Sequence, residues 1–409
     1  MTVLLYIDPG TGSMLFTILL GLVTSAYYVL KKLVIRLKFR MTSGKAVRND
    51  EKIPVVLFTD SKRYWDMFRP ICEELEKREC NAVYWTCSKD DPALKTAYKY
   101  VKCEYIGEIN RAAARLNVMS AKICLTTTPG LDVYQWKRSK STDWYVHVIH
   151  GIGDATCYRM FGLERFDAIL LAGDHQIQEL KELASVRGQE PKEMLLVGES
   201  HLDYLKKRHE EGIRDNTTGL TVLLAPSWGA SSILVRYGEK IINSLLDTGY
   251  SIIIRPHPQS MTSDKSVIDS LMARYNDSGK LVWDFNNDNF DSLNRADIMI
   301  SDFSSVIWDY TLIFDKPVIY ADVSFDADPY DLAWLNKERW DMQVLPEVGI
   351  ELKEEDFSNL KVMINEAIES PVLKKGRENI RSKEWAYPGE SAVRVVDYII
   401  GKLDYEQHC

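Results

Sequence analysis

Residues 297–320 read DIMISDFSSVIWDYTLIFDKPVIY, and this stretch contains a complete strand–helix–strand unit. It opens and closes on short apolar runs that suit buried strands. Between them, apolar residues recur at helical spacing from Val306 to Ile313. Two hydroxyl residues, Ser304 and Ser305, stand where the first strand gives way to the helix. Because parallel strands need a crossover of this kind, the stretch predicts a parallel α/β sheet.

The same alternation continues along most of the chain. From about residue 53, apolar runs such as IPVVLFT, NAVYWT and WYVHVIH are separated by amphipathic segments of helical length. A polar break at 210–219 precedes a second set of runs, which includes LTVLLAP, YSIIIRP and ADIMIS. The sequence therefore predicts an α/β protein in which two successive Rossmann-like domains face a cleft. We expect these domains at 46–214 and 215–409, after an N-terminal membrane segment at 1–45.

The first forty residues differ from the remainder. Residues 14–30 carry no charge, and residues 31–40 (KKLVIRLKFR) contain five basic side chains. Seventeen uncharged, mostly apolar residues are near the lower limit for crossing a bilayer, and the basic block predicts that the chain on its C-terminal side is cytoplasmic. The alternative is an amphipathic segment that lies in the interface against anionic lipid. Either interpretation places the catalytic domains on the cytoplasmic side of a cell inner membrane or plasma membrane.

Composition excludes several classes of protein. The net charge of −8 argues against a general nucleic-acid binder, which needs a basic surface. The seven cysteines are scattered without a C-x-x-C pair, which favours reduced thiols. Neither a Walker loop nor a G-x-S-x-G elbow nor a zinc-ligand spacing occurs in the sequence. We therefore predict no metal and no cofactor.

Polar residues collect where the predicted strands end, which is where parallel sheets bind ligands. HGIGD follows WYVHVI and places His150 beside Gly151, with Gly153 also leaving room for close approach. An imidazole with an ordinary pKa suits a general base for a hydroxyl, so His150 is a candidate catalytic residue. His147, in the middle of the strand, is expected to pack in the sheet.

The second half presents two further motifs. RPHP holds Arg255 and His257 between prolines directly after a strand, which suits an anionic ligand. At SDFSS, capping explains one hydroxyl of Ser304 and Ser305, but two hydroxyls at a helix start predict an anion cradle. The alternatives are a surface histidine in a proline turn and a plain helix cap.

These motifs, in this order, resemble the CDP-glycerol glycerophosphotransferase family, whose membrane-associated members build teichoic acids and related polymers. RPHP, the stretch 297–320 and YPGESAVRVVDYI carry the strongest resemblance, which covers roughly residues 140–400. HGIGD and APSWG stand where the family has its histidine–glycine and proline–tryptophan segments. The resemblance implies a GT-B-like fold with the acceptor mostly on the first domain and the cytidine nucleotide mostly on the second.

The resemblance also implies residue roles. His150 would take the proton from an acceptor hydroxyl, and His257 would act with Arg255 and the two serines on the diphosphate. Asp302 would orient the SDFSS loop, and the remaining predicted contacts to the nucleotide are Ser227 and Gly151. The sequence departs from the family pattern after Gly151, where it reads IGD, and at Gly229, where an arginine is common.

The predicted function is transfer of glycerol phosphate, or a related polyol phosphate, from a CDP-polyol donor to a lipid-linked or polysaccharide acceptor, with release of CMP. Membrane lipids are expected partners and nucleic acid is not. One alternative is a GT-B glycosyltransferase or epimerase that uses a UDP-sugar. Another is an inactive membrane-tethered binding protein of the same pathway. The sequence leaves open the polyol, the acceptor and the oligomeric state.

Overall fold

The computed structural model describes residues 26, 27, 30, 52–212, 219–276, 279–286, 288–321 and 325–405. The predicted membrane segment and the basic block after it therefore lie almost entirely outside the described residues. Among the residues that are described, no helix has the length and apolar character needed to cross a membrane.

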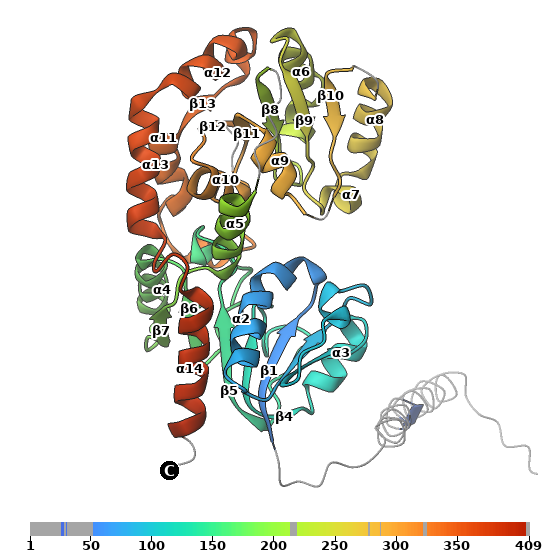
Figure 1. Ribbon diagram of the computed structural model, residues 1–409, viewed down its shortest axis with the longest axis vertical. Helices are drawn as coiled ribbons and strands as arrows, with labels where there is room; N and C mark the ends of the chain where they lie inside the picture. Colours follow the sequence, from blue (N-terminus) through green and yellow to red (C-terminus); the bar gives the residue numbers. More distant parts are fainter. Residues whose placement is uncertain are drawn as a thin grey trace, which may run out of the picture. The chain divides into compact units, whose positions relative to one another are not determined.

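The first sheet has seven strands in the order β3-β2-β1-β4-β5-β6-β7 (Figure 1). Every neighbouring pair is parallel, so the carboxyl ends of all seven strands lie at one edge. This edge receives the loops that carry the histidine–glycine motif. The strands are β1 (Ile53–Thr59), β2 (Ala82–Thr86), β3 (Val101–Tyr105), β4 (Ser120–Thr126), β5 (Ser141–Val148), β6 (Ala168–Leu171) and β7 (Glu193–Leu196).

The second sheet has six strands in the order β10-β9-β8-β11-β12-β13, and it is also wholly parallel. RPHP follows β9 and SDFSS spans the end of β11, so both motifs lie at one sheet edge. The strands are β8 (Thr221–Leu224), β9 (Ser251–Ile254), β10 (Leu281–Trp283), β11 (Ile298–Ser301), β12 (Val318–Ala321) and β13 (Gly349–Leu352).

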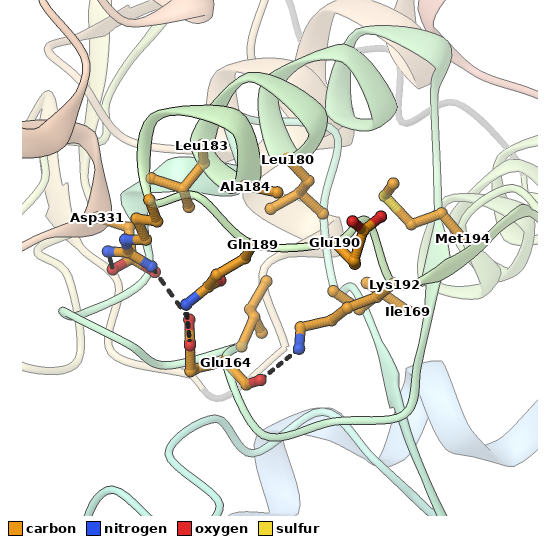
Figure 2. A pocket seen from close by; sticks show the side chains of 12 residues that line it. Glu164, Ile169, Leu180, Leu183, Ala184, Gln189, Glu190, Lys192, Met194 and Asp331 are labelled. Carbon is orange, nitrogen blue, oxygen red and sulfur yellow. Dashed lines mark hydrogen bonds and ion pairs between the residues drawn. The ribbon is translucent and has the colours of Figure 1, made fainter.

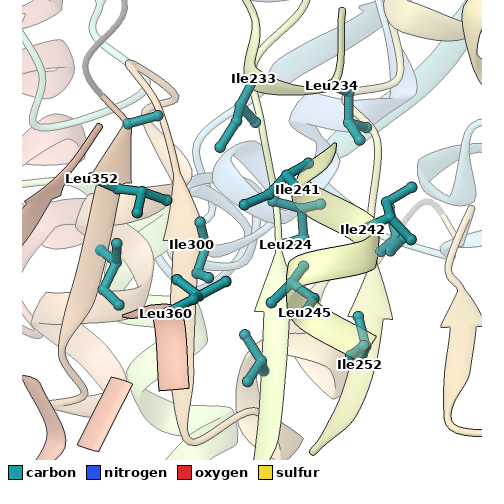
Figure 3. Packing of buried hydrophobic residues seen from close by; sticks show 14 of the residues in the cluster. Leu224, Ile233, Leu234, Ile241, Ile242, Leu245, Ile252, Ile300, Leu352 and Leu360 are labelled. Atoms are coloured by element: carbon teal, nitrogen blue, oxygen red, sulfur yellow. The ribbon is translucent and has the colours of Figure 1, made fainter. Parts of the chain in front are cut away.

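Helices cover the sheets because each contributes one apolar face to a core. In the second sheet, Ile241 and Leu245 of α6 pack over Leu224 and Ile300 (Figure 3). Burial of such side chains stabilises the fold by about 1.5–3 kcal/mol each. The helices are α2 (Trp65–Lys77), α3 (Ile109–Leu116), α4 (Asp174–Val186), α5 (Ser200–Glu211), α6 (Ile233–Asp247), α7 (Ser260–Ser263), α8 (Lys265–Tyr275), α9 (Phe290–Arg295), α10 (Val306–Phe314), α11 (Trp340–Val348), α12 (Leu360–Glu369), α13 (Pro371–Glu384) and α14 (Ser391–Tyr405). Short 3₁₀ turns complete the fold: η1 (Lys62–Tyr64), η2 (Pro92–Lys95), η3 (Ala155–Cys157), η4 (Asp331–Trp334) and η5 (Glu354–Asn359).

The C-terminal helix α14 packs on the first sheet. Val395, Val396 and Ile399 are fully buried in the core that also contains α2. The Trp144 indole N–H of β5 donates to the Tyr398 hydroxyl at 2.9 Å. The sequence prediction assigned residues 215–409 to the second domain, whereas helix α14 returns to the first sheet.

Helix α5 and the segment around η4 are among the elements that connect the sheets. Helix α5 contacts α2 on one side and α10 on the other. The segment that contains η4 also reaches the first half, where Asp331 N–H donates to the Tyr158 carbonyl at 3.0 Å. Because Tyr158 lies near His150, this segment helps to fix the surroundings of the candidate base.

Candidate active site

His150 follows β5 and belongs to the carboxyl edge of the first sheet. Its Nδ1 lies 2.7 Å from Thr127 Oγ1 and 3.3 Å from the Tyr158 hydroxyl. A proton on Nδ1 can be donated to Thr127 Oγ1, which leaves the lone pair of Nε2 free. This tautomer is the one that a general base requires.

The His150 imidazole is tuned to be neutral. Loss of surrounding water, with smaller contributions from the charges of Arg63 and His201, lowers the pKa of His150 to about 4. The residue nevertheless keeps accessible surface, so neighbouring protein displaces much of its water without sealing it. At neutral pH the ring is therefore unprotonated and reachable.

His147 is fully buried within β5. Its Nε2 lies 3.2 Å from the Tyr158 hydroxyl, and its ring packs 5.0 Å from that of Phe166. Burial lowers the pKa of His147 well below its usual value, with His150 as a smaller cause. His147 thus packs in the sheet as expected, and Tyr158 stands between the two imidazoles.

The loop after His150 is fixed by hydrogen bonds from helix α4. The Gln176 side-chain amide donates to the carbonyls of Gly151 and Gly153, each at 2.9 Å. A Cβ placed on Gly151 would meet no atom within 4 Å in the described part of the chain. The space next to Gly151 is therefore open, while its backbone is fixed.

His257 belongs to the edge of the second sheet and has the opposite tautomer. Its Nδ1 accepts from the Gln259 backbone N–H at 3.1 Å, which places the proton of the neutral ring on Nε2. Loss of surrounding water, with a smaller contribution from Arg63, lowers the pKa of His257 to about 4. His257 can thus donate a hydrogen bond without carrying a charge.

The two serines stand at the start of α10, which begins at Val306. Ser305 has a helical backbone conformation and makes no side-chain cap hydrogen bond. The carbonyls of Ser304 and Ser305 accept from Ile307 N–H at 3.2 Å and Trp308 N–H at 3.0 Å. Capping therefore does not explain the Ser305 hydroxyl, which suits an anion-binding helix start.

Asp302 connects this loop to the one that contains Ser227. Its Oδ1 accepts from Ser227 N–H at 2.8 Å, and its Oδ2 accepts from Ile233 N–H at 3.0 Å. Asp302 is buried, so its contacts orient loops. Nearby, Gly229 has φ +88°, a conformation that favours glycine. This backbone accounts for glycine where the related family commonly has arginine.

Arg255 has structural partners that sequence reasoning missed. Its Nη1 lies 2.5 Å from Asp284 Oδ2, and its Nη2 donates to the Asn286 carbonyl at 2.6 Å. The guanidinium is mostly buried by these contacts and holds the loop after β10. Its predicted contact with a diphosphate remains a prediction.

The two candidate histidines are influenced by one charged side chain. Arg63, in the turn η1 after β1, lowers the pKa of both His150 and His257 by charge repulsion. Such an interaction weakens steeply with distance in water and salt. One imidazole from each sheet therefore lies within electrostatic reach of the same guanidinium.

Sequence reasoning also missed a cluster at the end of β7. His201 Nε2 of α5 lies 3.9 Å from Asp309 Oδ2 of α10. Burial raises the pKa of Asp309 to about 7, and burial is also the main cause that raises the pKa of Glu199 to about 8. The signal was the sequence GESH, which overlaps the end of the predicted strand MLLVGE, because ligands bind at the carboxyl ends of parallel strands.

The candidate site does not coincide with the small cavity beside α4 (Figure 2). This cavity measures about 30 Å³, and Arg187 at its rim pairs with Glu164 and Asp331. None of the predicted site residues lines it. In the described part of the chain, no group of three or more histidine, cysteine or carboxylate side chains could hold a metal ion.

Three solved structures share the fold over most of the chain. A histidine-to-asparagine variant of the wall teichoic acid polymerase TagF, soaked with CDPG, is 14% identical, with a TM-score of 0.60 over 95% of this chain and 99% of that chain. A putative UDP-N-acetylglucosamine 2-epimerase from Listeria monocytogenes is 12% identical, with a TM-score of 0.55 over 85% and 95% of the two chains. MnaA from S. aureus, in a structure with UDP, is 13% identical, with a TM-score of 0.54 over 86% and 96%. These similarities establish the GT-B-like α/β fold.

A comparison with curated proteins gave no match. The sequence profile of the CDP-Glycerol:Poly(glycerophosphate) glycerophosphotransferase family, in contrast, matches residues 40–399. This range contains both sheets and every predicted site residue. The chain therefore belongs to the CDP-glycerol:poly(glycerophosphate) glycerophosphotransferase family and is an enzyme of that type.

Proposed function

We propose that the protein transfers glycerol phosphate, or a related polyol phosphate, from a CDP-activated donor to a hydroxyl of a lipid-linked or glycan acceptor, and releases CMP. Family membership supports the chemistry, and the fold shared with a TagF structure that was soaked with CDPG supports the donor. The observation that carries the proposal is the pair of neutral imidazoles, His150 and His257, which have complementary tautomers and share the influence of Arg63.

In the proposed step, the acceptor hydroxyl attacks the phosphorus that bears the polyol. His150 Nε2 takes the proton of the hydroxyl while the new O–P bond forms. The bond between that phosphorus and the oxygen bridging to CMP breaks, and its electron pair leaves with CMP. Phosphoryl transfer depends mainly on positioning and charge stabilisation, which this arrangement supplies without a covalent intermediate.

The second sheet would hold the diphosphate. The start of α10 offers backbone N–H groups, a favourable helix dipole and the hydroxyls of Ser304 and Ser305. His257 Nε2–H adds a neutral donor on the neighbouring loop. Asp302 holds the start of α10 next to the loop of Ser227, which is a predicted contact to the nucleotide.

Attachment to a membrane is part of the proposal. The uncharged stretch at 14–30 and the basic stretch at 31–40 support an anchor or an interfacial segment. A lipid-linked acceptor would then lie close to the catalytic domains on the cytoplasmic side. Sedimentation of the full chain with anionic lipid vesicles tests this element, and the full chain in the supernatant contradicts it.

A nucleotide panel tests the donor. The purified full chain is incubated with CDP-glycerol, CDP-ribitol, UDP-glucose and UDP-N-acetylglucosamine in the presence of glycerol as a simple acceptor. We expect CMP from a CDP-polyol and no product from either UDP-sugar. UDP release or epimerised sugar would support the glycosyltransferase or epimerase alternative. Binding of CDP-polyol without turnover, even with lipid-linked acceptor, would support the inactive binding protein.

A further inference from the structure

A diphosphate site needs positive charge, and Arg255, the predicted cation of this site, already forms an ion pair within the protein. Arg255 is paired with Asp284 at 2.5 Å and donates to a loop carbonyl, so its charge is largely balanced within the protein. His257 is neutral, because loss of water lowers its pKa to about 4. The second sheet therefore offers neutral donors and dipoles, and an additional cation would complement the charge of a phosphate.

Arg63 is exposed and lies on the other sheet, next to the candidate base. Its guanidinium carbon lies 4.6 Å from the centre of the Tyr64 ring, and that ring lies 4.8 Å from the His150 ring. Cation–π attraction of this kind holds a guanidinium beside the ring. Arg63 is thus held close to His150 from one side.

Arg63 differs from its neighbour in how its charge is balanced. Lys62 in the same turn forms an ion pair with Asp90. Within the described residues, Arg63 has no carboxylate oxygen within 4.0 Å. The acidic group whose pKa Arg63 influences is Asp60, and burial, as the largest cause, raises the pKa of that carboxyl above its usual value. In the described part of the chain, no carboxylate therefore forms a close ion pair with Arg63.

We propose that Arg63 binds a phosphate group next to His150, and that the first sheet thereby contributes a cation to a site whose other phosphate ligands would belong to the second sheet. This proposal rests on the proposed function and extends it. The phosphate has two possible sources. It is either the group transferred from the donor or a phosphodiester next to the acceptor hydroxyl.

Kinetics of three full-length variants test the proposal and separate the sources. Arg63→Ala removes the cation, Arg63→Lys keeps the charge without the planar fork, and Lys62→Ala is the matched control from the same turn. CMP release from CDP-glycerol is measured with glycerol as a neutral acceptor and with glycerol 3-phosphate as a charged one. For Arg63→Ala we expect kcat/KM to fall about 100-fold, a typical loss for one charge-stabilising donor. Arg63→Lys should recover part of the lost kcat/KM, and guanidinium added to the assay should partly restore the kcat/KM of Arg63→Ala. The kcat/KM of Lys62→Ala should equal that of the wild type.

Each pattern of rates has one meaning. An equal loss with both acceptors assigns Arg63 to the transferred phosphate. A loss confined to glycerol 3-phosphate assigns it to the acceptor phosphate. Equal rates for Arg63→Ala and Lys62→Ala with both acceptors overturn the proposal.

A binding measurement keeps the proposal independent of turnover. Inorganic pyrophosphate is titrated into the wild type, Arg63→Ala and Lys62→Ala, with thermal unfolding as a check of folding. We expect Arg63→Ala to bind pyrophosphate about tenfold more weakly, as loss of one charge-assisted contact implies. If the wild type releases no CMP, the proposed function fails, and this titration alone decides on Arg63. Unchanged pyrophosphate affinity would then reject the phosphate site as well.

Discussion

The carboxyl edges of the two sheets present different kinds of polar group. At the first edge, His150 is held by other side chains, Thr127 and Tyr158, and its titration is shifted by its surroundings. At the second edge, the buried carboxylate of Asp302 accepts two backbone N–H groups and so shapes the loops around the α10 start. Proton transfer needs a side chain with a tuned pKa, whereas anion binding needs fixed donors. In the proposed function, the first edge would supply the base and the cation Arg63, and the second edge would supply the neutral donors to the diphosphate.

Removal of the two imidazoles is expected to have the largest effect. His150→Ala and His257→Ala should each lower kcat/KM at least about 100-fold, because one loses the general base and the other a charge-stabilising donor. Of these two variants, only His257→Ala should also weaken the binding of CDP, since His150 is proposed to contact the acceptor hydroxyl rather than the nucleotide. Turnover and calorimetric titration with CDP measure the two effects separately. If His150→Ala weakened CDP binding as much as His257→Ala, the division of tasks would be wrong.

Removal of the two serine hydroxyls at the start of α10 is expected to have the second-largest effect. Ser304→Ala combined with Ser305→Ala should weaken CDP binding about 10- to 100-fold, because hydrogen bonds to charged groups contribute about 1.5–3 kcal/mol each. Thermal unfolding should stay almost unchanged, because the Ser305 side chain does not cap the helix. Gln259→Ala, on the same edge, keeps its backbone N–H bond to His257 and is a suitable control. A lower unfolding temperature with unchanged CDP affinity would instead indicate a capping role.

The strands that sequence reasoning found and the two that it missed, β3 and β13, differ in how apolar they are, since the edge strands β7 and β10 were predicted from the runs MLLVGE and KLVWDF. Central strands such as β8 and β11 are continuous apolar runs that parallel packing requires, and these were predicted. The edge strands β3 and β13 read VKCEY and GIEL, which are mixed in polarity because one side meets solvent. Helix α14 has a readable amphipathic pattern, but nothing in that pattern indicates which sheet it covers.

A similar limit applies to the site. His150, His257, Ser304 and Ser305 were predicted because strand ends in parallel sheets collect functional groups. Other residues of the candidate site were not predicted, because their closeness to their partners depends on how segments distant in the sequence pack together. These residues are Thr127, Tyr158, Arg63, His201 and Asp309. The ion pair between Arg255 and Asp284 likewise depends on packing and could not be predicted from the motif. A motif predicts the type of side chain at an edge, and only the packed structure shows which partners it has.

The pH dependence of kcat/KM sharpens the description of the first edge. Because the pKa of His150 is lowered to about 4, the imidazole is already neutral from about pH 6 to about pH 8. We expect kcat/KM to be flat in this range with respect to His150, and to fall as the pH drops through about 4, where the base becomes protonated. Arg63→Ala should move this acid limb to higher pH, because removal of a positive charge makes protonation easier. An acid limb near the ordinary imidazole value of about 6.5 in the wild type would contradict this tuning.

The smallest expected effects separate the two hydroxyl groups that contact His150 Nδ1. Thr127 Oγ1 lies at 2.7 Å and the Tyr158 hydroxyl at 3.3 Å, so Thr127 is the better acceptor for the Nδ1 proton. Thr127→Val should therefore lower kcat about tenfold, and Tyr158→Phe only about threefold, within the range of about 0.5–1.5 kcal/mol for a single hydrogen bond. KM for the donor should stay unchanged in both variants, since neither residue belongs to the second edge. Tyr158 also contacts the buried His147. A larger loss of kcat for Tyr158→Phe than for Thr127→Val would therefore contradict the role of Thr127. It would mean that the contacts from His147 through Tyr158 fix the tautomer of His150.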